Sequence, residues 1–167
     1  MTTYVAVLYS IILAPGRRLL MADLRQLAAE LGLANPRTLV ATGNLVFEAP
    51  RQKLAGLERK LEMAFAQRFG KHVDIIVRTA QDWKNLAAGN PFAEESRTNG
   101  QTVMVRIMRD PLPPESAKEL EPRCLSGERI AIVDGDLWVH FSEGFAATRL
   151  VPFLTPKRHG IGTIRNA

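Results

Sequence analysis

The sequence is poor in the residues that mark several classes of protein. Its single cysteine, Cys124, cannot form an internal disulfide, which argues against a disulfide-stabilised secreted scaffold. The longest apolar run, residues 4–14, is well short of the roughly 20 residues that a membrane-spanning helix needs. No positive charge precedes that run, so it lacks the pattern of a signal peptide. We therefore expect a cytoplasmic protein that makes no contact with a membrane.

What is present is the composition of an ordinary folded protein. Of the 167 residues, 46% are hydrophobic and 23% are charged, and both kinds are spread along the chain. Such a chain has enough apolar surface to bury a core, and its length suits one compact domain or two small domains in close contact.

The formal net charge of +5 comes from the first half of the sequence. Residues 1–89 hold 12 Lys and Arg against seven Asp and Glu, whereas residues 90–167 hold ten of each. Basic side chains recur along residues 51–71, but Glu58 and Glu62 are mixed among them. A nucleic-acid interface usually gathers charge of one sign, so this segment is more typical of a solvated helix.

The hydrophobic pattern of the first half predicts a mixed α+β unit. Leu20, Leu24, Leu27 and Leu31 recur at helical spacing, and Gly32 ends that helix. Strands are predicted over 4–9, 37–41, 44–49 and 72–78, and helices over 21–31 and 53–69. This order, βαββαβ, is that of the ferredoxin-like fold. A further helix over 80–88 follows the last strand.

The second half repeats this order of elements without repeating its residues. The predicted elements are a strand over 101–108, a short helix over 114–120, a hairpin of 128–133 and 136–141, a helix over 145–154 and a strand over 161–165. The pair Asp134-Gly135 is typical of the tight turn inside such a hairpin. We therefore predict two ferredoxin-like halves in tandem, residues 1–89 and 101–167, joined by a polar linker over 90–100.

The first strand carries apolar side chains on both of its faces. Val5 and Val7 point to one face of the sheet, and Tyr4 and Ala6 point to the other. We expect helices to cover one face, and the second half or a second copy in a homodimer to cover the other. An RNA-recognition domain would instead expose Tyr4 and Phe47 for base stacking. Burial of both rings is the stronger expectation.

Several short motifs occur in one order along almost the whole chain. They include Met21-Ala-Asp-Leu-Arg-Gln-Leu27, Thr42-Gly-Asn-Leu-Val-Phe47, Asn90-Pro-Phe92 and the closing Gly162-Thr-Ile-Arg-Asn166. On these motifs the sequence resembles the domain-of-unknown-function 1697 family. The resemblance implies an α+β protein of ferredoxin-like units, found mostly in bacteria, with no established activity.

The sequence departs from this family directly after the first strand. Relatives usually have Arg-Gly-Ile-Asn-Val-Gly-Gly there, a loop whose glycines let a ligand approach backbone N–H groups. This chain instead has Tyr9-Ser-Ile-Ile-Leu-Ala-Pro15, without the Arg, the Asn or the paired Gly. The resemblance therefore implies that any site in this loop is altered, reduced or moved.

Arginine and turn residues support the leading hypothesis for function, a binding or regulatory module for a small molecule or an anionic ligand. Arg forms paired hydrogen bonds with phosphate and carboxylate groups, and we predict the site in a groove between the halves. The candidate ligand-binding residues are Arg37, Thr42, Gly43, Asn44, Arg78, Arg149, Arg158 and Arg165. Residues 42–44 are also what a tight hairpin requires, and the turn is the stronger interpretation of that segment.

Two alternative functions remain open. The first is nucleic-acid binding by basic side chains of the first half, namely Arg59, Lys60, Arg68 and Lys71. The second is an enzyme of unassigned chemistry, which requires a buried titratable residue with a perturbed pKa in a pocket. Cys124 has no neighbouring His motif, and the other candidates show no metal-ligand spacing, namely His72, His140 and His159. We therefore expect no catalytic residue, no cofactor and no metal site.

Overall fold

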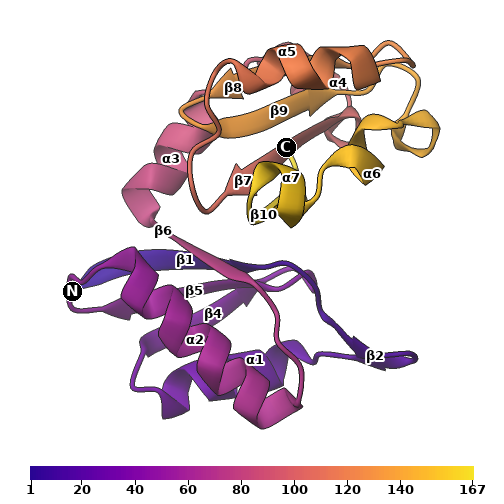
Figure 1. The fold of residues 1–167 in the computed structure, drawn as a ribbon. Helices are drawn as coiled ribbons and strands as arrows, with labels where there is room; N and C mark the ends of the chain where they lie inside the picture. The colour runs from indigo at the N-terminus through magenta and orange to yellow at the C-terminus, as the bar shows by residue number, and fades with distance from the viewer. The chain divides into compact units, whose positions relative to one another are not determined.

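Two four-stranded antiparallel sheets organise the structure, a computed structural model that describes residues 1–167 (Figure 1). Each sheet belongs to a separate unit of the chain, Met1–Lys84 or Asn85–Ala167. Helices pack against the sheet in both units. The predicted α+β class is therefore confirmed, and both sheets are antiparallel.

The sheet of the first unit has its first strand in the interior. Its strands are β1 (Thr2–Leu8), β4 (Ala34–Leu39), β5 (Asn44–Ala49) and β6 (Ile75–Thr79), in the spatial order β4-β5-β1-β6. All neighbours in the sheet are antiparallel, and β1 pairs with both β5 and β6. β6 is therefore an edge strand, with a neighbouring strand on one side only.

Two helices cover one face of this sheet, and both agree with the predicted ranges to within one residue. They are α1 (Met21–Glu30) and α2 (Leu54–Phe69). Gly70 ends α2 in the left-handed conformation, with a φ of 71°. Any residue with a Cβ would be strained there, so glycine is the natural end of the helix.

Large apolar side chains fill the space between the first sheet and its helices. Leu57, Leu61 and Phe65 of α2 are fully buried and share one cluster with Tyr4 and Phe47 of the sheet. The rings of Tyr4 and Phe47 stack with their centroids 5.6 Å apart. Because both rings lie in the core, they offer no open platform for base stacking, and the expected burial of this pair is confirmed.

Carboxylates from α2 occupy the outer edge of β6. The backbone N–H of Ile75 donates to Glu62 at 3.2 Å, and the N–H of Val77 donates to Glu58 at 3.1 Å. The two glutamates are four residues apart, about 6 Å along a helix, and the two amides are two residues apart, about 6.7 Å along a strand. Because these two spacings agree, one helix can satisfy both amides.

The third outward amide of β6 is satisfied by the helix that follows the strand. The N–H of Thr79 donates at 3.2 Å to Asp82, which lies in the first turn of α3 (Ala80–Ala88). The outward N–H groups at alternate positions of β6 therefore all donate to carboxylates. An open sheet edge invites pairing with other strands, and these bonds satisfy its outward N–H groups within the chain.

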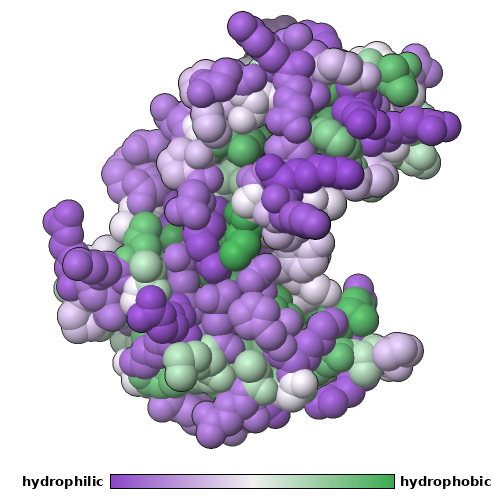
Figure 2. Space-filling model, viewed as in Figure 1, coloured by the Kyte–Doolittle hydropathy of each residue, from purple (hydrophilic) through white to green (hydrophobic).

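The altered loop after β1 forms a two-stranded ribbon. β2 (Ile12–Ala14) and β3 (Arg17–Arg18) pair antiparallel across the residues between them, Pro15 and Gly16. The side chain of Ile12 is exposed, and Figure 2 shows hydrophobic atoms, in green, near the segment that Figure 1 labels β2.

The sheet of the second unit has the same strand order as the first. Its strands are β7 (Val103–Met108), β8 (Arg129–Val133), β9 (Asp136–His140) and β10 (Gly162–Asn166), in the order β10-β7-β9-β8. All neighbours are again antiparallel. The turn between β8 and β9 has positive φ at both Asp134 and Gly135, as the sequence predicts.

The helices of the second unit are shorter than those of the first. α5 (Ser116–Leu120) follows β7, and α6 (Leu150–Phe153) and α7 (Pro156–His159) lie between β9 and β10. Three 3-10 turns complete the unit, namely η1 (Gly100–Thr102), η2 (Glu121–Arg123) and η3 (Phe145–Ala147). No helix in the chain has the length and apolar character that a membrane span requires.

The continuous helix predicted over 145–154 is wrong. The segment is divided between η3 and α6, and α7 begins two residues after it. Pro152 has no N–H to donate, so it is tolerated in the first turn of α6 but would break a helix that began at residue 145. The hydroxyl of Thr148 accepts the N–H of Leu150 and so marks the new start.

Residues 90–100, predicted as a linker, form an ordered part of the second unit. They contain α4 (Ala93–Thr98), and the division between the units falls earlier, between Lys84 and Asn85 within α3. Phe92 is buried, and the guanidinium carbon of Arg129 lies 5.2 Å from its ring centroid. The polar composition of this segment therefore reflects an exposed helix and not an extended connection.

Both sheets have an apolar second face, as the first strand predicts. In the first unit, Val7 and Ile76 oppose each other on the face away from the helices, and both are buried. In the second unit, Val105 and Trp138 oppose each other on the corresponding face and are also buried.

Removal of one edge carboxylate tests the arrangement along β6. Glu58→Ala leaves the buried N–H of Val77 without this acceptor, so we expect the free energy of unfolding to fall by about 1–3 kcal/mol. Arg59→Ala, at the exposed neighbouring position, should change it by less than about 0.5 kcal/mol. Urea denaturation followed by circular dichroism measures both values. Equal losses in the two variants would contradict the role assigned to Glu58.

Candidate functional site

A pocket of ≈ 450 Å³, with mostly polar residue types in its lining, lies at the N-terminal end of α2, entirely within the first unit. Its walls come from β1, the segment before α2, the end of β6 and the start of α3. The lining residues are Thr2, Tyr4, Arg51, Gln52, Lys53, Leu54, Thr79 and Gln81. Two of these residues are cationic and none is acidic, so the pocket is suited to a negatively charged ligand.

The backbone before α2 is held in place by a buried tyrosine. Tyr4 is 1% exposed, and its hydroxyl accepts the backbone N–H of Gln52 at 3.1 Å. The side-chain amide of Gln52 donates in turn to the carbonyl of Pro50 at 3.2 Å. The core of the sheet thereby positions the segment that carries Arg51 and Lys53.

The start of α2 adds to the positive potential of the pocket. Lys53 is the N-cap residue and makes no side-chain capping bond, and the first turn of the helix contains no acidic residue. The first N–H groups of a helix lack intrahelical partners and together carry a partial positive charge. Arg51 and Lys53 stand beside that charge, so this end of the pocket attracts anions.

Thr79, at the end of β6, and Gln81, in the first turn of α3, line the pocket. The hydroxyl of Thr79 donates to Asp82 at 2.6 Å, and the backbone N–H of Asp82 donates back to that hydroxyl at 3.1 Å. Asp82 is engaged in this reciprocal cap and is not among the lining residues. The cap therefore fixes the wall, and its carboxylate lies behind the lining residues and not among them.

Three of the predicted ligand-binding residues lie on one face of the first sheet. Arg37 is opposite Val46, Val46 is opposite Val5, and Val5 is opposite Arg78. The two arginines therefore stand at the ends of one row across four strands, with their Cα atoms about 14 Å apart. Asn44 lies in the next row of the same face. Arg37 and Asn44 are diagonal neighbours on adjacent strands, whereas Arg78 lies on the opposite edge of the sheet.

Residues 42–44 form a turn whose polar groups bond within it. The side-chain amide of Asn44 donates to the hydroxyl of Thr42 at 2.9 Å and to the carbonyl of Leu39 at 3.2 Å. Gly43 has a φ of 82°, and a Cβ at this position would lie 2.9 Å from the side chain of Ile11. Both the conformation and the packing therefore require glycine, which supports the turn interpretation.

The three predicted arginines of the second unit have different surroundings. Arg149 is exposed just before α6. The guanidinium carbon of Arg158 lies 4.5 Å from the ring centroid of Phe153. Arg165 lies in β10, where burial lowers its pKa to about 10, and it donates to the hydroxyl of Thr163 at 2.8 Å. With that pKa its guanidinium stays protonated at neutral pH.

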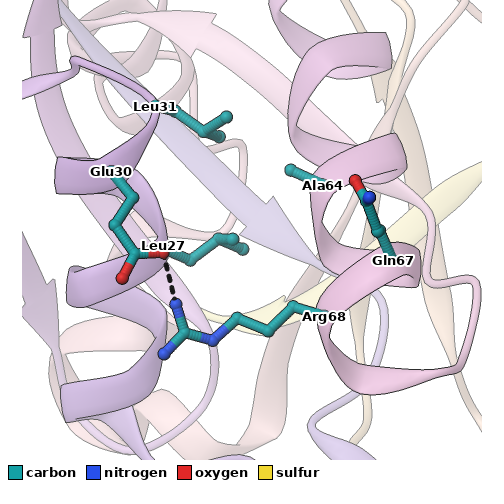
Figure 3. Close-up of a pocket in the computed structure, with 6 residues that line it drawn as sticks. All are labelled: Leu27, Glu30, Leu31, Ala64, Gln67 and Arg68. Carbon is teal, nitrogen blue, oxygen red and sulfur yellow. Dashed lines mark hydrogen bonds and ion pairs between the residues drawn. The ribbon is translucent and has the colours of Figure 1, made fainter.

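A second pocket, of ≈ 490 Å³, lies between α1 and α2 (Figure 3). Leu27 and Leu31 extend from α1 toward Ala64 on α2. Arg68 reaches across from α2 to Glu30 on α1, with 2.7 Å between the charged atoms. Because the two charges in this pocket neutralise each other, it is less suited to an anion than the pocket at the start of α2.

The basic residues predicted for nucleic-acid binding also make contacts within the first unit. Arg68 forms the ion pair with α1, and the ammonium of Lys60 donates to the carbonyl at the C-terminal cap of α1 at 3.1 Å. The ammonium of Lys71 donates to a carbonyl of β2 at 2.7 Å, and Arg59 is exposed. The nucleic-acid alternative stays a prediction.

The titratable groups with shifted pKa values lie outside both pockets. Burial raises the pKa of the Cys124 thiol, which makes it a poor nucleophile at neutral pH. The side chain of His159 is 2% exposed, and burial lowers its pKa. Neither residue lines the pockets at α2, so neither supplies the perturbed group that the enzyme alternative requires there.

Sequence analysis missed one group of potential metal ligands. The structure brings Glu62, His72 and Asp74 together, with their ligand atoms all within 4.8 Å of one another. The spacing of His72 and Asp74, which places two side chains on one side of an extended segment, was the only local signal. Glu62 comes from α2, ten residues earlier than His72, and no short motif joins the three.

The pocket at the N-terminal end of α2 was also not predicted from the sequence. None of the eight predicted ligand-binding residues lines it. The one sequence feature that could have indicated this pocket is the run Pro50-Arg51-Gln52-Lys53. It precedes a helix that starts without an acidic or capping residue. Tyr4, Thr79 and the other walls are distant in sequence, so the pattern alone does not assemble them.

The fold defines a two-unit α+β protein with the same strand order in both sheets. The chain belongs to a family described as protein of unknown function (DUF1697), whose model matches residues 1–138. Its structure is similar to that of the conserved bacterial protein SP0830 from Streptococcus pneumoniae, with a TM-score of 0.75 and 26% identity over 99% of this chain and 93% of that chain. No curated protein matches the sequence. These comparisons confirm the resemblance seen in the motifs and indicate no specific function.

The burial of His159 makes stability depend on pH. Its pKa is lowered in the folded state, so the unfolded chain binds a proton more readily. Buried, neutral His159 therefore makes its full contribution to the free energy of unfolding above the usual histidine pKa of about 6.5. This contribution is lost as the pH falls below that value.

We expect the free energy of unfolding to fall less between about pH 7.5 and about pH 5 in His159→Gln than in the wild type. Urea titrations at the two pH values measure the difference. The same slope in His159→Gln and wild type would show that another group controls this range.

Proposed function

We propose that this protein binds a small anionic molecule in the pocket at the N-terminal end of α2. The observation that carries the proposal is the charge of the pocket, which has Arg51 and Lys53 among its walls and no acidic residue. Hydrogen bonds from cationic side chains to anionic oxygens are about twice as strong as neutral ones. The uncapped start of α2 favours negative charge at the same place.

The remaining walls favour an organic ligand that carries the anionic group. Thr2, Gln52, Thr79 and Gln81 supply neutral donors and acceptors, and Leu54 supplies apolar contact. The volume of ≈ 450 Å³ lies in the range of small-molecule sites, which is about 300–1,000 Å³. These features support a phosphorylated or carboxylated small molecule as the class of ligand.

The proposal keeps the ligand class predicted from the sequence and changes the place of the site. The prediction relied on arginines from both halves of the chain, whereas all the walls of this pocket belong to the first unit. The altered loop, residues 9–15, contributes none of the walls. The proposed site is therefore separate from the loop in which this chain departs from its family.

We also propose that the two units are ferredoxin-like βαββαβ repeats in tandem, joined within α3. The equal strand orders and the antiparallel neighbours in both sheets support this assignment. The positions of the helices support it too, since in each unit helices follow the first and the third strand. In these terms the pocket lies at the start of the second helix of the first repeat.

A matched pair of double variants tests the proposed function. Arg51→Gln with Lys53→Gln removes both cations of the pocket, and Arg59→Gln with Lys60→Gln removes the same charge from exposed positions of α2 outside it. A thermal-shift screen of phosphorylated and carboxylated metabolites first identifies a ligand, and calorimetry then measures its affinity. We expect affinity to fall about tenfold or more in the pocket variant and less than about twofold in the control.

Two outcomes of this experiment would contradict the proposal. Equal losses in the two variants would mean that the general charge of the first unit, and not the pocket, attracts the ligand. Failure of every anion in the screen to bind the wild type would contradict the proposed ligand class.

Binding of a labelled oligonucleotide at about 50 and 200 mM salt tests the nucleic-acid alternative with the same variants. Oligonucleotide binding that is lost only in the Arg59 and Lys60 variant would favour that alternative.

A further inference from the structure

We infer that Glu62, His72 and Asp74 form a binding site for a divalent transition-metal ion such as Zn²⁺, separate from the anion pocket. The Nε2 atom of His72 lies 2.9 Å from Oδ1 of Asp74 and 3.9 Å from Oε2 of Glu62. One ligand atom from each of the three residues lies within 4.8 Å of the other two. One imidazole and two carboxylates, from α2 and from the segment that leads into β6, therefore meet at one point.

The distances between these atoms are close to those of a metal site. Zn²⁺ binds imidazole nitrogen and carboxylate oxygen at about 2.0–2.2 Å, so two ligands of a tetrahedral ion are about 3.4 Å apart. The distances of 2.9 and 3.9 Å from His72 lie on either side of that value. The side chain of His72 is 64% exposed, so its ring nitrogen is accessible to an ion from solvent.

Backbone contacts hold the carboxylate of Glu62 and the main chain of Asp74 in place before an ion binds. The Oε2 atom of Glu62 also accepts the backbone N–H of Ile75 at 3.2 Å. The carbonyl of Asp74 accepts the N–H of Tyr9 at 2.9 Å, which ties this residue to the end of β1. The side chains of Glu62 and Asp74 are only 14% and 23% exposed. These contacts reduce the ordering that binding requires.

The chemistry of the three side chains selects the class of metal. Two carboxylates carry two negative charges, which one divalent cation neutralises. Mg²⁺ and Ca²⁺ prefer oxygen ligands, whereas imidazole nitrogen favours Zn²⁺, Co²⁺ and Ni²⁺. Lys71 is adjacent to His72 in the sequence, but its ammonium donates to the carbonyl of Ile12 at 2.7 Å. A mixed nitrogen and oxygen set therefore points to a transition metal.

Three protein ligands leave at least one coordination position open. Structural zinc sites usually have four protein ligands, whereas sites that bind water or a small molecule on the metal have three. The exposure of His72 gives solvent access to the open position. The site is thus of the kind that holds an exchangeable ligand on the ion.

Metal titration of protein without an affinity tag tests this inference. We expect a single Zn²⁺ to bind each chain in calorimetry at about pH 7.5. His72→Ala and Asp74→Asn should each weaken binding about tenfold or more. His140→Gln removes a histidine outside the group and should leave the affinity unchanged. Zn²⁺ should also raise the melting temperature of wild type and His140→Gln, but not of His72→Ala.

Circular dichroism establishes whether each variant is folded. If either His72→Ala or Asp74→Asn is unstable, the other still tests the inference. The absence of saturable Zn²⁺ binding to folded wild type would overturn the inference. Equal binding by folded His72→Ala or Asp74→Asn would also overturn it. Mg²⁺ binding as tight as that of Zn²⁺ would do the same, since it would indicate a simple acidic cluster. Zn²⁺ binding does not involve Arg51 or Lys53, so this experiment and the test of the anion pocket can fail independently.

Discussion

Carboxylates along the outer edge of β6 set the geometry of the first unit. The amides of Ile75, Val77 and Thr79 donate to three carboxylates, two from α2 and one from α3. An amide that loses its acceptor in the protein interior costs about 1–3 kcal/mol, so α2 cannot shift along β6 without a large loss of stability. The helix, the strand and the start of α3 are therefore held in one register.

That register places the two proposed sites at different positions along α2. At the start of the helix, Lys53 and the end of β6 at Thr79 contribute to one pocket. Farther along the helix, Glu62 reaches the start of β6, where His72 and Asp74 approach it. Both sites consist of residues from the first unit, and both depend on the same contact between one helix and one strand.

Local patterns predicted most elements, whereas contacts distant in sequence determined the sites. Leucine spacing predicted α1 closely, and the Asp134-Gly135 pair predicted the hairpin of the second unit. The effect of Pro152 was missed, and the polarity of residues 90–100 did not distinguish an exposed helix from a linker. The pocket depends on a hydrogen bond between Tyr4 and Gln52, which are 48 residues apart, and no motif spans that separation.

Native-state hydrogen exchange at β6, followed by NMR, tests the account most directly. The amide of Ile76 points toward β1, whereas those of Ile75 and Val77 point outward to Glu62 and Glu58. We expect the two outward amides to exchange as slowly as Ile76, because all three then open only with the sheet. Rapid exchange at Ile75 and Val77 with slow exchange at Ile76 would contradict the account, since it would show an edge that the helix does not satisfy.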